Sequence, residues 1–131
     1  ARNGTTVVTG GSGGYPWPNA SEWEVDPWRY YKRQCVSFVA WARYAYRDGA
    51  VMPYALGNAG EWDNKVPWDH NPSVGAIAVW DPGVQTAGSV GHVARVIAVH
   101  GGTIDVEEYN WRPLQYSQRF SVPVSGLKFI H

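Results

Sequence analysis

One cysteine and four histidines are the residues of this chain best suited to covalent chemistry. The cysteine is Cys35, and the histidines are His70, His92, His100 and His131. A cysteine hydrolase needs a thiolate, a base that accepts the thiol proton, and a group that orients the base. A single cysteine cannot form an internal disulfide or a multi-cysteine metal cluster. The alternative is a small buried apolar side chain without chemistry. The residues around Cys35 must distinguish these two possibilities.

Cys35 lies at the start of a segment that has the pattern of a central helix. Residues 34–48 contain neither Pro nor Gly, are apolar on nearly all sides, and are followed by Gly49, a residue type that commonly ends helices. About fifteen residues would be long for the alternative, a buried strand. We therefore predict a helix packed on several sides, with its N-terminal dipole favouring a negative charge on Cys35.

A predicted β-hairpin follows in the second half of the chain. Two runs rich in β-branched residues, 91–100 and 103–109, flank the pair Gly101-Gly102, which is typical of a tight turn between antiparallel strands. His92 opens the first of these runs. The second run ends with two glutamates and is followed by an asparagine, so the hairpin brings acidic and amide groups toward an imidazole.

The register of this hairpin decides which glutamate can orient His92, because a slip of one residue exchanges the two faces of a strand. A two-residue turn places Glu107 on the face of His92. A three-residue turn places Glu108 and Asn110 there instead. Counting along the strands leaves both registers open.

The remaining chain supplies the elements that position these groups. Residues 57–63 predict a short helical turn, and the apolar runs 76–80 and 127–130 predict strands that complete the sheet. A helix followed by several strands predicts an α+β fold. Residues 1–14 are rich in glycine, which is typical of a flexible linker or an added leader. Residues 15–131 form a single domain, and its first segment, 15–28, is irregular and held by its aromatic side chains.

Composition excludes several classes of function. The chain has 131 residues, 44% of them hydrophobic and 15% aromatic, with a formal net charge of zero. A zero net charge argues against binding to nucleic acid through phosphate neutralisation and against a polybasic membrane anchor. No apolar run approaches the ~20 residues that span a bilayer, so we expect no membrane insertion.

Five short segments occur in the order expected of a CHAP domain, a cysteine, histidine-dependent amidohydrolase/peptidase. The segments are RQCVSFVAW, GNAGEW, NPSVGAIAVW, GHVARV and VEEYNW. The chain resembles this family from about residue 23 to its end. The resemblance implies a papain-like α+β fold, in which an N-terminal helix bears the nucleophile and packs on an antiparallel β-sheet.

The same resemblance implies roles for five residues. Cys35 corresponds to the nucleophile, His92 to the base, and Glu108 to the acid that orients the base. Asn110 corresponds to an additional polar residue beside the histidine. Trp111 resembles the indole that shields this pair from water in papain-like enzymes. These assignments favour the register with Glu108, rather than its neighbour, on the face of the histidine.

Further side chains are candidates for binding the substrate. The hydroxyl of Tyr30 or the amide of Gln34, together with the backbone N–H of Cys35, is a candidate donor to an oxyanion. The alternatives are a packed tyrosine and a residue that merely starts the helix. Trp62 and Trp111 are candidates for lining a substrate groove, although tryptophan in a small domain more often belongs to the core.

We predict that the site contains no metal and no other cofactor. Some CHAP domains bind calcium through several acidic residues around the nucleophile. Here Asp26 is the one carboxylate that fits such a site, and the nearby positions hold Trp28, Lys32 and Ser37. One carboxylate is far short of the oxygen cage that calcium needs. The four histidines lack the helical spacing that is typical of zinc sites.

The resemblance also implies a reaction and a substrate, namely amide-bond hydrolysis through a thioester in bacterial peptidoglycan. We favour an endopeptidase over an N-acetylmuramoyl-L-alanine amidase. The expected setting is a secreted or cell-wall-associated protein, in which this chain is a monomeric module of a longer polypeptide. The alternatives are a non-catalytic cell-wall-binding module and an amidase that acts on a small thiol–polyamine conjugate.

Overall fold

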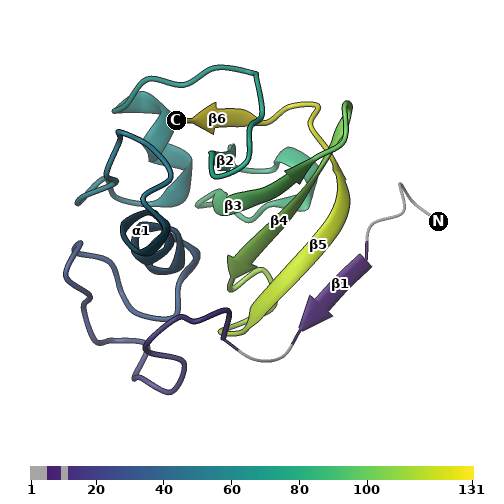
Figure 1. Ribbon diagram of the computed structural model, residues 1–131. Helices are drawn as coiled ribbons and strands as arrows, with labels where there is room; N and C mark the ends of the chain where they lie inside the picture. Colours follow the sequence, from purple (N-terminus) through teal and green to yellow (C-terminus); the bar gives the residue numbers. More distant parts are fainter. Residues whose placement is uncertain (1–5, 10–11) are drawn as a thin grey trace.

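The computed structural model describes residues 6–9 and 12–131 and shows an α-helix beside an antiparallel sheet (Figure 1). Within the described residues the sheet has six strands in the order β1-β5-β4-β3-β2-β6, and each neighbouring pair is antiparallel. The elements in chain order are β1 (Thr6–Thr9), α1 (Cys35–Tyr46), the 3₁₀-helix η1 (Ala59–Asn64), β2 (Ile77–Trp80), the 3₁₀-helix η2 (Val84–Thr86), β3 (His92–Val99), β4 (Thr103–Tyr109), β5 (Tyr116–Pro123) and β6 (Lys128–Ile130). The predicted α+β architecture is confirmed.

Helix α1 is the predicted central helix, and it begins at Cys35. Its end differs from the prediction. Arg47 adopts a left-handed conformation (φ 56°), and its N–H bonds the carbonyl of Arg43, so the helix closes before Gly49. Gly49 instead permits a close approach, since a Cβ there would lie 2.8 Å from the backbone of His131.

Two apolar clusters cover the opposite faces of the sheet, because alternate residues of β2 and β3 enter different clusters. Val79 and Val93 join the cluster around the helix, which also contains Phe38 and Val39. Their neighbours along the two strands join a second cluster, whose other members come from β4, β6 and the chain around them. The sheet is therefore buried on both faces, and the helix covers one of them.

Two strands are absent from the sequence prediction. Strand β5 follows the hairpin and pairs with β4, and β1 pairs with β5 through the register Thr6↔Phe120 to Thr9↔Ser117. Thr6–Thr9 are therefore an edge strand, which corrects the expectation of a flexible linker for these four residues. Of the rest of that expectation, residues 1–5, 10 and 11 lie outside the described residues, and residues 12–14 form a turn in which the carbonyl of Ser12 accepts from the N–H of Tyr15 at 2.9 Å. Tyr15, at the predicted start of the domain, is buried in the core around the helix.

The β3–β4 hairpin combines features of both registers considered from the sequence. Its turn is the two-residue form, with the N–H of His100 bonded to the carbonyl of Thr103. Farther along, β3 contains one extra residue between Val96 and Ala98, a β-bulge that shifts the pairing by one. Beyond the bulge the pairing is the one that a three-residue turn would have produced. Glu108 therefore lies on the face of His92.

The fold brings the functional ends of three elements together. Strand β3 begins and strand β4 ends on the side of the sheet that faces α1 (Figure 1), and both strands contact the helix. Within the described part of the chain, no helix has the length and apolar character needed to cross a membrane.

Candidate active site

Cys35, His92 and Glu108 form a connected group where α1, β3 and β4 meet. His92 and Glu108 bond through Nε2 and Oε1 at 2.8 Å, and the carboxylate is fully buried. This bond occupies Nε2 and leaves Nδ1 as the ring nitrogen that can serve Cys35, since Cys35 and His92 line the same hollow. Cys35 itself is partly exposed. The three groups therefore run from solvent inward in the order thiol, imidazole and carboxylate.

Two opposing influences set the protonation of His92. Burial by itself lowers the pKa of His92, because it penalises the charged ring. The negative charge of Cys35 and the hydrogen bonds with Cys35 and Glu108 outweigh burial and raise the pKa to about 9. At neutral pH the ring is therefore an imidazolium, and the buried carboxylate of Glu108 stabilises its charge.

The carboxylate of Glu108 is held by a second partner that the sequence prediction missed. Arg119 of β5 donates from Nε to Oε2 at 2.6 Å and from Nη2 to Oε1 at 3.0 Å. Burial alone raises the pKa of Glu108, but the hydrogen bonds and charges of His92 and Arg119 overcome it and lower this pKa. Glu108 thus stays ionised although no water reaches it.

Two indoles pack around the imidazole. The ring of His92 lies 5.0 Å from that of Trp111 and 5.3 Å from that of Trp80, measured between centroids. Trp80 is opposite His92 in the β2–β3 pairing. The position of Trp111 agrees with the shielding role that the resemblance implies, and both rings exclude water from the bond between His92 and Glu108.

Asn110 lies near the site but bonds elsewhere. Its Nδ2 donates to Oε1 of Gln34 at 2.8 Å, and its Oδ1 accepts from the N–H of Leu114 at 2.6 Å. Oε1 of Gln34 is therefore occupied by Asn110, and the side chain of Gln34 lines both hollows beside Cys35. Asn110 reaches the nucleophile through Gln34, and its hydrogen bonds in the structure are not with His92.

The family model of the CHAP domain matches residues 25–110, which is more than half of the chain. The chain belongs to the CHAP domain family. Members of this family are cysteine, histidine-dependent amidohydrolases or peptidases, and the chain is therefore an enzyme of this class. The match includes Cys35, His92 and Glu108, which the structure brings together.

Solved structures share the fold of this chain. An N-acetylmuramoyl-L-alanine amidase from Staphylococcus aureus superposes with a TM-score of 0.69 over 85% of this chain and 33% of that protein, at 24% identity. The protein Ly7917 superposes with a TM-score of 0.52 over 75% of this chain and 53% of its own, at 18% identity. The chain thus spans about a third and about half of these two proteins. Among curated proteins none matches the chain significantly.

Tyr30 is placed differently from the sequence expectation for this CHAP domain. Its hydroxyl donates to the carbonyl of Pro53 at 2.8 Å and accepts from the N–H of Leu56 at 3.0 Å. Burial raises the pKa of Tyr30 to about 12. Its one proton is committed to Pro53, so Tyr30 cannot donate to an oxyanion. Gln34 remains as the side-chain candidate.

Trp62 is also a core residue rather than part of a groove. Its side chain is fully buried in the cluster around α1, and its Nε1 donates to the carbonyl of Gly57 at 3.1 Å. The ring packs against Tyr30, with 5.6 Å between centroids. Trp111, by contrast, remains partly exposed and lines the cavity beside His92. The structure therefore keeps only one of the two predicted groove tryptophans at the surface.

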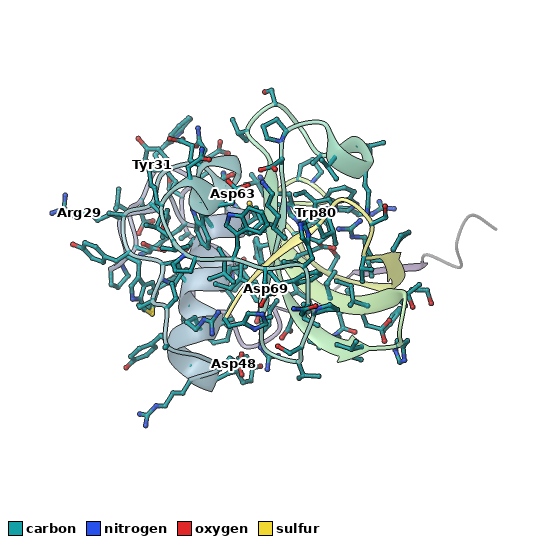
Figure 2. The ribbon with its side chains drawn as sticks, turned by 90° about the horizontal axis from the view of Figure 1, so that it is seen from above. Arg29, Tyr31, Asp48, Asp63, Asp69 and Trp80 are labelled. Carbon is teal, nitrogen blue, oxygen red and sulfur yellow. The ribbon has the colours of Figure 1, made fainter. Side chains whose placement is uncertain are left out.

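Two hollows of similar size adjoin Cys35 in the CHAP domain. One has a volume of about 260 Å³ and extends past Tyr31 and Arg29. The other has a volume of about 280 Å³ and is lined by His92 and Trp111. Arg29 and Tyr31 lie on the helix side of the molecule and Trp80, the neighbour of His92, lies on the sheet side (Figure 2). Cys35 therefore lies between two hollows.

Asp26 does not belong to a metal site of the kind that calcium requires. Its Oδ1 accepts from the N–H groups of Trp28 and Tyr30 at 2.8 and 2.9 Å, and its Oδ2 is buried without a partner. One such oxygen supplies a small part of a calcium shell.

The neighbouring positions offer no further ligands for calcium. The hydroxyl of Ser37 bonds the hydroxyl of Tyr15 at 2.7 Å, and the ammonium of Lys32 lies 4.6 Å from the centre of the Trp17 ring. Within residues 6–9 and 12–131, no group of three or more His, Cys, Asp and Glu side chains is placed to hold a metal ion. The residues present do not fit calcium, and metal-independent activity stays a prediction.

Proposed function

We propose that this CHAP domain hydrolyses an amide bond of bacterial peptidoglycan through a thioester on Cys35. The observation that carries the proposal is that Cys35 and His92 line one hollow and that His92 is bonded to the buried Glu108. The likeness to an N-acetylmuramoyl-L-alanine amidase supports the choice of substrate. As a further proposal, the domain acts outside the cell, at the wall, as a module of a longer protein.

The reaction begins with the ion pair of Cys35 and His92. The thiolate attacks the carbonyl carbon, and a tetrahedral oxyanion forms beside the N-terminus of α1. The backbone N–H of Cys35 and Nε2 of Gln34 donate to this oxygen. The C–N bond then breaks as His92 gives its proton to the leaving amine, and a thioester remains.

The second half of the reaction regenerates the enzyme. Neutral His92 accepts a proton from water, the resulting hydroxide attacks the thioester, and Cys35 leaves as the thiolate. Glu108 holds the ring through Nε2 in both halves and stabilises its positive charge. Because Arg119 stabilises the ionised carboxylate, Glu108 keeps its negative charge and does not accept the proton of His92.

The direction of the bound substrate follows from the position of the proton donor. His92 lines only one of the two hollows beside Cys35, the one with Trp111. Because His92 must reach the departing amine, the amine side of the substrate occupies this hollow. The acyl side extends over Gln34 toward Tyr31.

Replacing Cys35 by Ala tests the proposal. We expect the variant to lose release of soluble fragments from purified cell walls, at unchanged melting temperature. A variant that clears walls as fast as the wild type would identify a non-catalytic binding module. Activity on a small thiol–polyamine conjugate, with none on walls, would identify the other alternative.

Mass analysis of the released fragments identifies the bond. We propose an endopeptidase, which exposes new amino termini within the stem peptide or cross-bridge. Release of peptides that begin with the L-Ala attached to muramic acid would identify an amidase instead. Both outcomes retain Cys35 as the nucleophile.

Alkylation gives a test of the ion pair that needs no substrate. Because the pKa of His92 is raised to about 9, we expect iodoacetamide to label Cys35 rapidly at pH 6, where ordinary thiols react slowly. His92→Gln should slow this labelling at the same pH. Equal rates in the two proteins would contradict the pairing.

A further inference from the structure

Arg119 has two sets of contacts that converge on His92. Its guanidinium makes two hydrogen bonds to Glu108, at 2.6 and 3.0 Å, and its central carbon lies 3.7 Å from the centre of the Trp111 ring. Trp80 lies on the same guanidinium at 5.1 Å. Arg119 thus touches the acid and both indoles that surround the imidazole, and it is itself only 4% exposed.

A second β-bulge places Arg119 on this face. Near the tip of the hairpin β4 and β5 pair as Ile104↔Val122, and beyond one extra residue in β5 they pair as Val106↔Arg119. Ser121, within the bulge, has a left-handed conformation (φ 56°), and its N–H bonds Asp105 at 2.9 Å. Without the extra residue, Arg119 would share the face of the other glutamate.

We propose that Arg119 is a positioning residue of the active site, which acts on His92 through Glu108 and Trp111. This inference rests on the proposed amide hydrolysis. Arg119 binds both carboxylate oxygens and so fixes the orientation of the carboxylate, in which Oε1 contacts both Arg119 and His92. It also supplies the charge that keeps Glu108 ionised in a fully buried position, where a carboxylate without partners would take up a proton.

Arg95 offers a matched control on the opposite face of the sheet. It binds the other glutamate, Glu107, at 2.7 Å and Asp48 at 2.6 Å, and it stacks on Tyr46 at 3.9 Å. Both arginines are thus largely buried, bind carboxylates and lie on aromatic rings. Only Arg119 of the two is connected to His92. If both arginines were purely structural, the two substitutions would have similar consequences.

The first experiment compares Arg119→Gln with Arg95→Gln. We expect Arg119→Gln to lower kcat about 10- to 100-fold, the effect of losing charge-assisted hydrogen bonds to one buried group, with little change in KM. The acid limb of its pH profile should move to higher pH, because Glu108 then accepts a proton more readily. Arg95→Gln should lower the melting temperature but leave the acid limb in place.

Arg119→Lys keeps the positive charge but loses the bidentate hydrogen bonding to Glu108. It should recover part of the activity that Arg119→Gln loses. It also serves if Arg119→Gln does not fold. In a Glu108→Gln background, Arg119→Gln should cost less than about threefold more, because the group through which it acts is already gone.

The proposal is overturned if Arg119→Gln keeps the wild-type kcat and acid limb, if Arg95→Gln shifts that limb equally, or if the losses from Glu108→Gln and Arg119→Gln are additive. The rate of Cys35 alkylation as a function of pH gives the same comparison without any substrate. A shift of that profile in Arg119→Gln alone supports the positioning role even if peptidoglycan is the wrong substrate.

Discussion

Glu107 and Glu108 are adjacent in β4, both are buried, and each is bound by an arginine from a neighbouring strand. Glu107 faces Arg95 and the hydroxyl of Tyr116. Glu108 faces Arg119 on one side and His92 on the other. One carboxylate therefore ends in a structural network, and the other connects such a network to His92.

The difference between the two glutamates is one of direction, not of chemistry. Successive side chains of a strand point to opposite faces, so their separate surroundings follow from the pairing of β4 with β3 and β5. Each of these pairings contains a one-residue shift. The bulge in β3 turns His92 toward Glu108, and the bulge in β5 turns Arg119 toward the same residue. A functional carboxylate is thus selected by register.

The largest expected effect separates the two glutamates by activity. Glu108→Gln should lower kcat/KM about 10²- to 10⁴-fold, because the neutral amide no longer stabilises the imidazolium of His92. Glu107→Gln should change kcat/KM by less than about threefold, since its contacts do not reach the site. Hydrolysis of purified walls by both variants measures this. A greater loss in Glu107→Gln would show that the register is wrong.

The next effect is on the pH dependence of the reaction. His92 is protonated below its pKa of about 9 and loses its proton as the pH rises through that value. The pairing with Cys35 and the proton for the leaving amine are both lost with it, so kcat/KM of the wild type should fall above about pH 9. In Glu108→Gln this alkaline limb should move to lower pH, because a contribution that raises the pKa of His92 is removed. An unchanged limb in that variant would contradict the assignment.

Stability is expected to distinguish the two residues less sharply. Glu107→Gln removes the charge that binds Arg95 and Tyr116, and it should reduce the free energy of unfolding by about 1–3 kcal/mol. Denaturation in urea measures this change. Glu24→Gln is the control, since Glu24 forms an exposed pair with Lys32 and should have a smaller effect. Equal effects would mean that the network of Glu107 contributes little.

The smallest expected effect is that of a chelator. Both buried glutamates are neutralised by arginines, and Asp26 is without the partners of a calcium site, so EDTA should leave the activity of the wild type unchanged. A large loss that added calcium restores would show that a metal ion acts in this site after all. Assays with and without EDTA, at constant ionic strength, decide the point.

Local pattern was sufficient to predict the elements that carry the nucleophile and the base. The absence of Pro and Gly after Gln34 predicted α1, and the glycine pair between two β-branched runs predicted β3 and β4. Strand β5 was missed because buried polar residues, Ser117 and Arg119, interrupt its apolar alternation. The arginine that holds Glu108 was therefore missed with it.

The sequence predicted which residues belong to the candidate site better than it predicted the contacts that those residues make. Tyr30 and Trp62 were plausible from their types and positions, but both are committed to the core by hydrogen bonds and packing. Asn110 was expected beside the histidine, and its hydrogen bond goes to Gln34 instead. Such contacts join residues far apart in the chain, so no local pattern specifies them.

By itself, the sequence determined the single cysteine, the helix that begins with it, the hairpin that begins with His92, and the α+β order of elements. Periodicity and turn residues act over a few positions, and the sequence reports them directly. Only the tertiary structure decided that Glu108 rather than Glu107 faces the base and that Arg119 holds it. Both outcomes depend on one extra residue in each of two neighbouring strands, and bulges arise from how strands pack together rather than from the residues within them.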